Sequence, residues 1–559
     1  MKKKLSILLL FMGIIGCTDL NEQVLDETLS PSGTSAKQAA DGAIAPVYGR
    51  LYDLFNHTNY FALQEISTDE AILPYRGGTD WGDNGIYIAM HQHTYTSSDP
   101  NIRSTWTFIN QGIAKALVAI SALPAIDDES AKVYLAEARG MKAFYSMLSL
   151  DLFGLVFTKG NVNDVSTILR GAEAVEYIKA DLLAAEADLD PNAGPGRLTP
   201  AAVWGLLARL HLNAAVYADR YATSFNFAGD DMDKVISYTE KIIQSGKYQL
   251  SNDYFAVFGN NNHDNKELIF AIDQRFDIAG SHNRLAYFSI SGDQWPLANY
   301  PNANGTDGPA ITPDFYRTWT DAYGATDPAN ADPRFYKQNL AIYSDPTATC
   351  VSADNYNINR GILRGQQYGL VKQNGAFVKC GDGTYQMAKL FNVSRNKPTL
   401  PVDFTLDVNY STFSNHNNGY RVEKYEFGKN SDTGRNKGDA DIIILRLADV
   451  HLMHAEAKLR KGDAGTALQD VNTVRAARTL TTAAPALTSM NLDLLLRERG
   501  FELYWEMHRR TDMIRFGKYE STWTEKTNSD VRKRIFPIPQ TAIDAASNIP
   551  GYLVQNEGY

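Results

Sequence analysis

A single tryptophan, Trp81, lies among acidic, amide and glycine residues in the stretch YRGGTDWGDNG, residues 75–85. The glycines give this backbone turns and little packing surface, so the indole ring is predicted to be presented at the surface. A flat aromatic ring can stack on the C–H face of a sugar, while carboxylate, amide and guanidinium groups can hydrogen-bond to its hydroxyl groups. The neighbouring side chains of these types are Arg76, Asp80, Asp83 and Asn84. The stretch therefore predicts a carbohydrate-binding surface, and a ring that only anchors its own loop is the alternative.

Pairs of carboxyl groups raise the alternative of a glycoside hydrolase, which needs two of them about 5 to 10 Å apart around the sugar. Asp80 and Asp83 could lie at that separation, but no apolar surroundings in the sequence would keep one of them protonated as a general acid. Glu498 and Glu502 lie one helical turn apart among several arginines, a pattern typical of ion pairs in a scaffold. We therefore expect a binding protein and not an enzyme.

Histidine pairs are the candidate metal ligands. His91 and His93 lie two residues apart on a possible strand, and His451 and His454 lie three residues apart on a helix. Neither pair has a third ligand at a recognisable spacing, so solvated or core histidines are expected and no metal site is predicted. The sequence also lacks a phosphate-binding loop, a dinucleotide fingerprint and a Gly-x-Ser-x-Gly motif, so we expect no cofactor.

Amphipathic helical periodicity dominates the chain on both sides of a loop-rich middle. In TPAAVWGLLARLHLNAAVYAD, Pro200 lies near a helix start, and Gly246 closes the helix that follows. In ADVHLMHAEAKLRKGDAGTALQDVNTVRAAR, one helix gives way to another at Gly462 and Asp463. Such helix pairs predict a mainly α, tetratricopeptide-like scaffold, although their spacing is too irregular for a regular repeat. The segments with helical periodicity are 32–56, 103–153, 171–190, 199–219, 230–246, 440–478 and 491–516.

Residues 248–439 form the loop-rich middle. They are rich in Asn, Asp, Gly and Tyr and carry only short strand-like runs, such as Glu267 to Ile272. A long irregular insertion in a helical scaffold is typically functional or disordered, and the frequent aromatic residues argue against disorder. No Pro-rich or Gly/Ser-rich linker divides the chain. We therefore expect one domain over residues 32–559, with a helical scaffold at 32–247 and 440–559 and a partly β insertion at 248–439.

The chain begins MKKKLSILLLFMGIIGC, with three lysines, an apolar run too short to span a bilayer, and a cysteine. Residues 1–16 are predicted to be a signal peptide. Its end resembles the bacterial lipobox, so Cys17 is predicted to be lipidated, and an ordinary signal peptide with an incidental cysteine is the alternative. Residues 17–31 are polar and acidic and are expected to form a lipidated tether.

Charge and cysteine content narrow the choice of partners. The formal net charge is −10, and loss of the leader with its lysines makes it more negative, so nucleic acid is not an expected partner. The remaining cysteines, Cys350 and Cys380, could pair in an exported protein. Two thiols in so long a chain do not form a disulfide scaffold, and the sequence leaves open whether they are bonded.

Six blocks of sequence together resemble the SusD/RagB family of outer-membrane lipoproteins. The resemblance extends from the lipobox to Tyr559, and the blocks occur in family order. They are EARGMKAFYSMLSLDLFGLV, GRLTPAAVWGLLARLHLNAA, VISYTEKIIQSGKYQL, ILRLADVHLMHAEAKLRKGDAGTALQDVNTVRAAR, LLRERGFELYWEMHRRTDMIRFG and FPIPQTAIDAASNIPGYLVQNEGY.

The resemblance implies a SusD-like fold, a glycan-binding site that takes oligosaccharide or polysaccharide, and a lipid anchor in the outer membrane at the cell surface. It also implies a partner, a SusC-like TonB-dependent transporter over which the protein sits. In the family, an aromatic residue from the region of Trp81 lies beside residues of the later insertion, and the candidates here are Trp295, Tyr300 and Arg364. Trp319 has helix-like spacing and is expected in the core. A tetratricopeptide scaffold that binds only protein partners remains an alternative.

Overall fold

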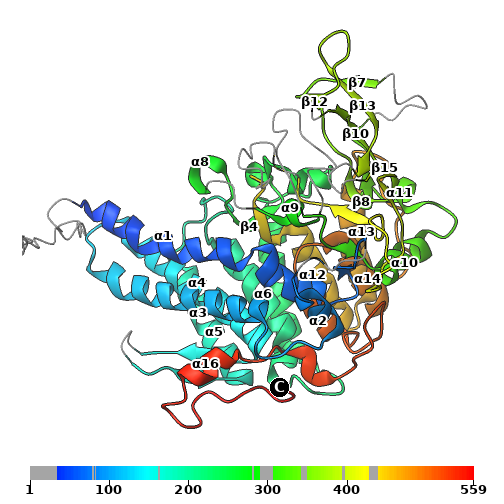
Figure 1. Ribbon diagram of the computed structural model, residues 1–559. Helices are drawn as coiled ribbons and strands as arrows, with labels where there is room; N and C mark the ends of the chain where they lie inside the picture. Colours follow the sequence, from blue (N-terminus) through cyan, green and yellow to red (C-terminus); the bar gives the residue numbers. More distant parts are fainter. Residues whose placement is uncertain are drawn as a thin grey trace, which may run out of the picture.

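The computed structural model describes residues 34–559 except 78–80, 82, 161–163, 280–282, 290–305, 341–348, 375, 393–396, 427 and 429–437 (Figure 1). The prediction of a mainly α fold with a partly β insertion is confirmed. Before the middle of the chain, the helices are α1 (Ala36–Leu54), the π-helix η1 (His57–Ile66), α2 (Ile86–Gln92), α3 (Pro100–Ala122), η2 (Leu123–Ala125), α4 (Ser130–Phe153), α5 (Gly171–Glu186), α6 (Pro200–Ala218) and α7 (Gly229–Gln244). After the middle, they are α12 (Leu447–Arg460), α13 (Ala464–Ala477), α14 (Leu492–Leu503), α15 (Arg509–Arg515), η7 (Val531–Arg534) and α16 (Gln540–Ala545).

Local sequence signals set the starts of the long helices. Ser35 and Gln38 form a capping box at the start of α1. Asp99 caps α3 and Thr199 caps α6, and each is followed by a proline, which costs no hydrogen bond at the first helical position. These helices therefore begin close to the positions that the sequence predicts.

Three of the predicted helical segments need correction. Segment 491–516 is two helices, α14 and α15, with residues 504–508 between them. Segment 103–153 is two helices, because Pro124 lies in η2 and cannot donate the hydrogen bond that would continue α3. Segment 440–478 begins with a strand, β18 (Ile442–Arg446), which pairs antiparallel with β4 (Leu268–Ile272). All five residues of each strand are buried. A short apolar run of this kind cannot be assigned to helix or strand by periodicity alone.

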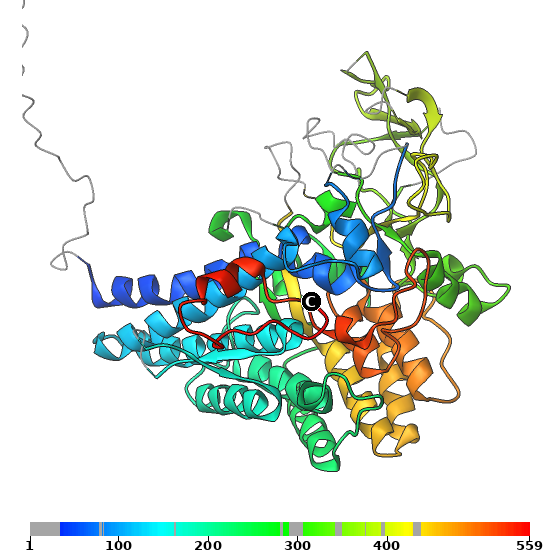
Figure 2. The ribbon, with the colours of Figure 1, turned by 60° about the horizontal axis from the view of Figure 1, so that its bottom comes forward.

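The helices pack as successive pairs: α3 on α4, α4 on α5, α5 on α6, α6 on α7, and α12 on α13. Helix α12 also packs on α7, so the N-terminal and C-terminal helices meet directly, side by side in Figure 1. The C-terminal segment with α16 lies over the N-terminal helices in Figure 2, where the backbone N–H of Gln540 donates to the carbonyl of Ser97 at 2.9 Å. The largest hydrophobic core contains residues from Ala40 to Ile538. It includes residues of the insertion at 248–439, such as Phe288 and Ile362, so the insertion packs on the helical scaffold.

Helix α3, taken together with η2, is long and apolar enough to cross a membrane by length and composition alone, and it is the one such helix among the described residues. Its side chains Ile102, Trp106 and Ile109 are buried in the largest core, where the helix packs on α1 and α4. Core helices meet the same criterion, so this is weak evidence for a membrane span.

The middle of the chain is built from short strands and helices. Its second, smaller core includes Leu363, Met387 and Phe404. Strands β7 (Thr349–Val351), β10 (Tyr368–Leu370) and β13 (Tyr385–Lys389) form a small antiparallel sheet within an arm that stands out from the body (Figure 1), and a disulfide joins Cys350 to Cys380 there. The helices of the middle are η3 (Phe255–Phe258), η4 (Asn262–Asp264), α8 (Phe276–Ala279), α9 (Leu285–Ser289), α10 (Pro313–Tyr323) and α11 (Pro328–Ala331). Besides β4, the strands of the middle are β5 (Ala310–Ile311), β6 (Tyr336–Lys337), β7 (Thr349–Val351), β8 (Arg360–Leu363), β9 (Gly365–Gln366), β10 (Tyr368–Leu370), β11 (Lys372–Gln373), β12 (Ala376–Phe377), β13 (Tyr385–Lys389), β14 (Phe391–Asn392), β15 (Lys397–Pro401), β16 (Asp403–Phe404) and β17 (Arg421–Glu423). The N-terminal half contains three further strands, β1 (Ala71–Ile72), β2 (Val156–Thr158) and β3 (Thr167–Leu169).

Buried ion pairs join the insertion to the C-terminal helices. The carboxylate of Glu502, on α14, accepts hydrogen bonds from Arg446 at 2.7 Å, Arg478 at 2.5 Å and Arg334 at 3.3 Å. Burial alone would raise the pKa of Glu502, but the three guanidinium groups outweigh burial and hold that pKa well below its usual range. Arg446 also pairs with Glu506 at 2.7 Å. Glu502 and its neighbours are therefore structural ion pairs, as the sequence pattern indicated.

Candidate functional site

The ring of Trp81 is partly buried. Its indole N–H donates to the backbone carbonyl of Thr306 at 3.2 Å, and its ring meets Tyr87 and Phe288 edge to face, with centroids 5.5 and 5.4 Å away. Aromatic pairs favour this geometry. The expectation of a ring that packs on little is therefore wrong, while its role as a ligand contact stays a prediction.

The residues on which Trp81 packs belong to the core. Phe288 lies on α9 and is fully buried. The next residue, Ser289, accepts a hydrogen bond from the indole N–H of Trp505 at 2.9 Å, which ties α9 to the C-terminal part of the core. Tyr87 lies on α2 and is also buried. The orientation of the Trp81 ring is thus set by core residues from two short helices.

Asp83 and Asn84 connect Trp81 to α2. The carboxylate of Asp83 accepts hydrogen bonds from the backbone N–H groups of Gly85 at 3.1 Å and Tyr87 at 3.0 Å, so it satisfies two donors at the helix start, where Gly85 is the N-cap residue. Asn84 is exposed and has φ 61°, a left-handed conformation that asparagine tolerates better than most residues. Its amide is thus placed at the surface, three residues after Trp81 in the sequence, where it could meet a hydroxyl group.

Arg76 is buried, and its position does not support a direct contact with ligand. Its Nε donates to the carbonyl of Asn418 at 3.1 Å, and its Nη1 donates to the carbonyls of Asp307 and Gly308. One guanidinium group therefore holds together three segments that are distant in sequence. We therefore treat Arg76 as a positioning residue, and this arrangement does not support its predicted hydrogen bonds to sugar hydroxyl groups.

A second arginine joins two of these three segments. Arg421 is fully buried and pairs with Asp307 at 2.7 Å, while its Nη2 donates to the carbonyl of His416 at 3.1 Å. The backbone N–H of Tyr75 donates to the carbonyl of Asn409 at 3.2 Å. We call the group of neighbouring segments formed by residues 75–77, 81, 83–84, 306–308 and 409–421 the loop cluster.

Arg364 lies apart from these contacts. Its guanidinium donates to the hydroxyl oxygen of Tyr316 at 3.0 Å and to the carboxylate of Asp327 at 2.8 Å, and it lies 4.8 Å from the ring centroid of Phe335. Among the described residues, Arg364 and Trp81 share no hydrogen bond, ion pair or ring contact. The other predicted site residues, Asp80, Trp295 and Tyr300, lie outside the described residues, as does Cys17.

Residues 409–418, NYSTFSNHNN, are a part of the loop cluster that the sequence prediction missed. The side chain of Phe413 is 96% exposed there. Like residues 75–85, this stretch places an aromatic side chain among small and polar residues. The sequence therefore did contain a feature that could have marked it as a candidate binding loop. It was missed because nothing in the sequence places the two segments side by side.

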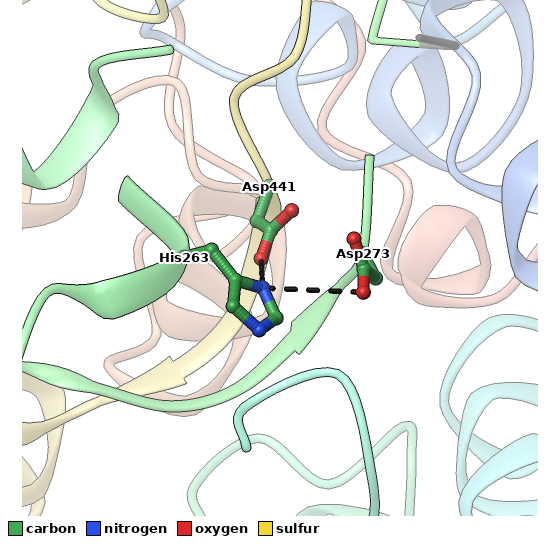
Figure 3. A group of neighbouring side chains, drawn as sticks. All are labelled: His263, Asp273 and Asp441. Atoms are coloured by element: carbon green, nitrogen blue, oxygen red, sulfur yellow. Dashed lines mark hydrogen bonds and ion pairs between the residues drawn. The ribbon is translucent and has the colours of Figure 1, made fainter. Parts of the chain in front are cut away.

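One group of side chains could hold a divalent cation: His263 on η4, Asp273 after β4 and Asp441 before β18 (Figure 3). The His263 Nδ1 lies 2.7 Å from the Asp441 carboxylate and 4.0 Å from that of Asp273. The hydrogen bond with Asp441 raises the pKa of His263, and burial raises the pKa of Asp441. Arg275 pairs with Asp273 at 2.7 Å, so a cation here would compete with the arginine and with His263 for the two carboxylates.

The two histidine pairs considered in the sequence are buried. His91 lies on α2, not on a strand, and its Nε2 lies 2.8 Å from the carbonyl of Thr524. His93 lies 2.8 Å from the carbonyl of Ser67, and burial holds its pKa well below the usual range. His454 bonds the carboxylate of Asp470 at 2.6 Å. Trp319 is fully buried, as expected, and stacks on Phe501 with centroids 3.7 Å apart.

Comparisons with known proteins agree with this architecture. The chain is 25% identical over 528 residues to the starch-binding protein SusD of Bacteroides thetaiotaomicron, covering 89% of this chain and 85% of that one. Surface glycan-binding protein A of the same organism, solved in complex with laminarihexaose, superposes with a TM-score of 0.63 at 20% identity, over 92% of this chain and 98% of that chain. A SusD superfamily protein of Parabacteroides distasonis superposes with a TM-score of 0.67 at 18% identity, over 94% of this chain and all of that one.

The family model described as the SusD family matches residues 242–559, more than half of the chain, and includes both the insertion and the C-terminal helices that carry the buried ion pairs. These structural neighbours share the helical scaffold over nearly their whole length. The chain belongs to the SusD family.

Proposed function

We propose that this protein is a glycan-binding lipoprotein of the cell surface that captures oligosaccharides and delivers them to a TonB-dependent transporter in the outer membrane. The observation that carries the binding role is the loop cluster, in which a partly exposed indole ring is fixed by core residues and bordered by polar side chains. Fixed groups lose little conformational freedom when a ligand binds, so more of the contact energy appears as affinity. The relatives named for starch and laminarihexaose support a glycan as the ligand.

The position of Asp83 argues against glycoside cleavage on this surface. Its carboxylate accepts two backbone hydrogen bonds at the start of α2, so its oxygens already bind the backbone there, whereas a hydrolase needs a carboxyl group available as acid or nucleophile. We therefore propose binding without chemistry.

The function is tested with the purified mature protein on an array of polysaccharides that includes starch and laminarin, followed by calorimetry with the strongest binder. We expect binding and no release of reducing ends from the bound glycan over many hours. Release of reducing ends that disappears in Asp83→Asn would establish a hydrolase instead. Absence of binding to every polysaccharide would favour a scaffold for protein partners only.

The proposed lipid anchor gives a second prediction, at Cys17. In Cys17→Ala, the thiol that accepts the acyl chain is missing, so the protein should be found in the soluble fraction or remain uncleaved, while the unaltered protein sediments with outer membranes. Cell fractionation with immunoblotting measures this. Cys380→Ala, which removes a cysteine of the arm, serves as the control and should stay with the membranes. If Cys17→Ala also stays there in processed form, another anchor exists.

A further inference from the structure

Phe413 is more exposed than any other large apolar side chain among the described residues, with 96% of its surface accessible. It lies near the tip of residues 409–418, between Ser411 and the exposed Asn415. A fully exposed phenylalanine contributes almost nothing to the hydrophobic core, so its stability role is negligible. Isolated apolar side chains are common at protein surfaces, so exposure alone does not make Phe413 a ligand contact. The argument for a ligand contact depends on the hydrogen bonds and packing that fix its loop.

The loop around Phe413 is ordered by its own hydrogen bonds. The backbone N–H of Ser411 donates to the side chain of Asn409 at 2.9 Å, and the N–H of Phe413 donates to the hydroxyl oxygen of Ser411 at 3.2 Å. The N–H of Ser414 donates to the carbonyl of Ser411 at 3.1 Å. These bonds fix the backbone on both sides of Phe413, so a ligand that stacks on the ring meets a loop that is already arranged.

The same loop is fastened to the segment that leads to Trp81. Besides the bond between Tyr75 and Asn409, the rings of Tyr75 and Tyr410 meet edge to face at 6.4 Å. Gly77 touches the ring of His416 so closely that a Cβ on Gly77 would lie 2.2 Å from it. Trp81 is four residues from Gly77, and Phe413 is three residues from His416. At ~3.5 Å per residue, the backbone of each ring-bearing residue therefore lies within about 14 Å of this contact.

We propose that Phe413 is a second aromatic platform of the ligand site, which stacks on a sugar ring of the same oligosaccharide that Trp81 binds. This inference rests on the proposed glycan-binding function. It assigns the ligand class more closely, as a chain of several sugar units with accessible C–H faces, because one monosaccharide cannot cover two separate rings. Asn415, which is exposed two residues after Phe413, offers an amide that can hydrogen-bond to sugar hydroxyl groups.

The test compares Phe413→Ala with the unaltered protein by calorimetry. The ligands are oligosaccharides of two to six units from the polysaccharide that binds most strongly on the array. We expect affinity for the six-unit chain to fall about tenfold, by analogy with the lower end of base–aromatic stacking. Affinity for the two-unit chain should be unchanged, since that chain is too short to need both rings. The melting temperature should not change, because the ring is almost fully exposed.

Two further variants complete the experiment. Phe413→Tyr keeps a flat ring and should restore affinity for the six-unit chain, while Phe276→Ala removes another exposed ring, 59% accessible on α8, and should have no effect. Unchanged affinity of Phe413→Ala for the six-unit chain overturns the inference and leaves the proposed function intact. An equal loss for both chain lengths also overturns it, since it would place Phe413 in the same subsite as Trp81. If the unaltered protein binds no polysaccharide, the inference falls together with the proposed function.

Discussion

Glu502→Ala is expected to lower the free energy of unfolding by about 3–5 kcal/mol, the usual cost of removing one partner from a buried ion pair. Glu502 is fully buried, and its carboxylate is shared by Arg446, Arg478 and Arg334. Removing it leaves three guanidinium groups in the core with less negative charge around them. Urea denaturation, followed by circular dichroism, measures the change.

A matched control distinguishes burial from charge. Asp493 pairs with Lys518 at 3.0 Å, but its side chain is 78% exposed, so Asp493→Ala should change the free energy of unfolding by less than about 1 kcal/mol. Glu502→Gln keeps the size of the side chain and should still destabilise the protein, because the amide is neutral. If Glu502→Ala unfolds at the same urea concentration as the unaltered protein, the buried network is not structural.

Trp81→Ala should weaken glycan binding by roughly ten to a hundredfold, because base–aromatic stacking, the nearest analogue, is worth about 1–3 kcal/mol per ring and each 1.4 kcal/mol is tenfold in affinity. The variant should also lose some stability, since the ring packs edge to face on Tyr87 and Phe288. At about 0.5–1.5 kcal/mol for each aromatic pair, the expected loss is roughly 1–3 kcal/mol. Calorimetry measures the affinity, and chemical denaturation measures the stability.

The conservative variant Trp81→Phe separates the two roles of the ring. It keeps an aromatic face for the sugar, but it cannot donate to the carbonyl of Thr306. We expect most of the affinity to be retained with a modest loss of stability. Unchanged affinity in Trp81→Ala, accompanied by a large loss of stability, would make the ring a structural anchor only.

Much of the scaffold could be predicted from sequence because its signals are local. Capping residues such as Ser35 and Thr199, the prolines that follow caps, and the period of the apolar residues together specify where helices start and which face they bury. Strand β18 was missed because its short apolar run is equally compatible with a buried helix, and its partner β4 lies far away in sequence.

The site was harder to predict because it is assembled from distant segments. The composition around Trp81 indicated an exposed aromatic residue, but not that Phe288, from the middle of the chain, lies beneath it. The sequence also indicated a role for Arg76 without revealing that its guanidinium would be used by backbone carbonyls more than 200 residues away, at Asp307 and Asn418. Long-range contacts of this kind leave no periodic or local signature.

The way in which Arg76 joins the loops has a consequence for how binding preference can change during evolution. Its partners are the main-chain carbonyls of Asp307, Gly308 and Asn418, and every amino acid supplies such a carbonyl. Exposed side chains beside this junction, such as Asn84 and Phe413, can therefore be replaced without breaking the bonds that hold the loops in place. A protein built in this way can change its ligand preference by substitution at a few surface positions. The backbone arrangement that presents those positions then stays the same.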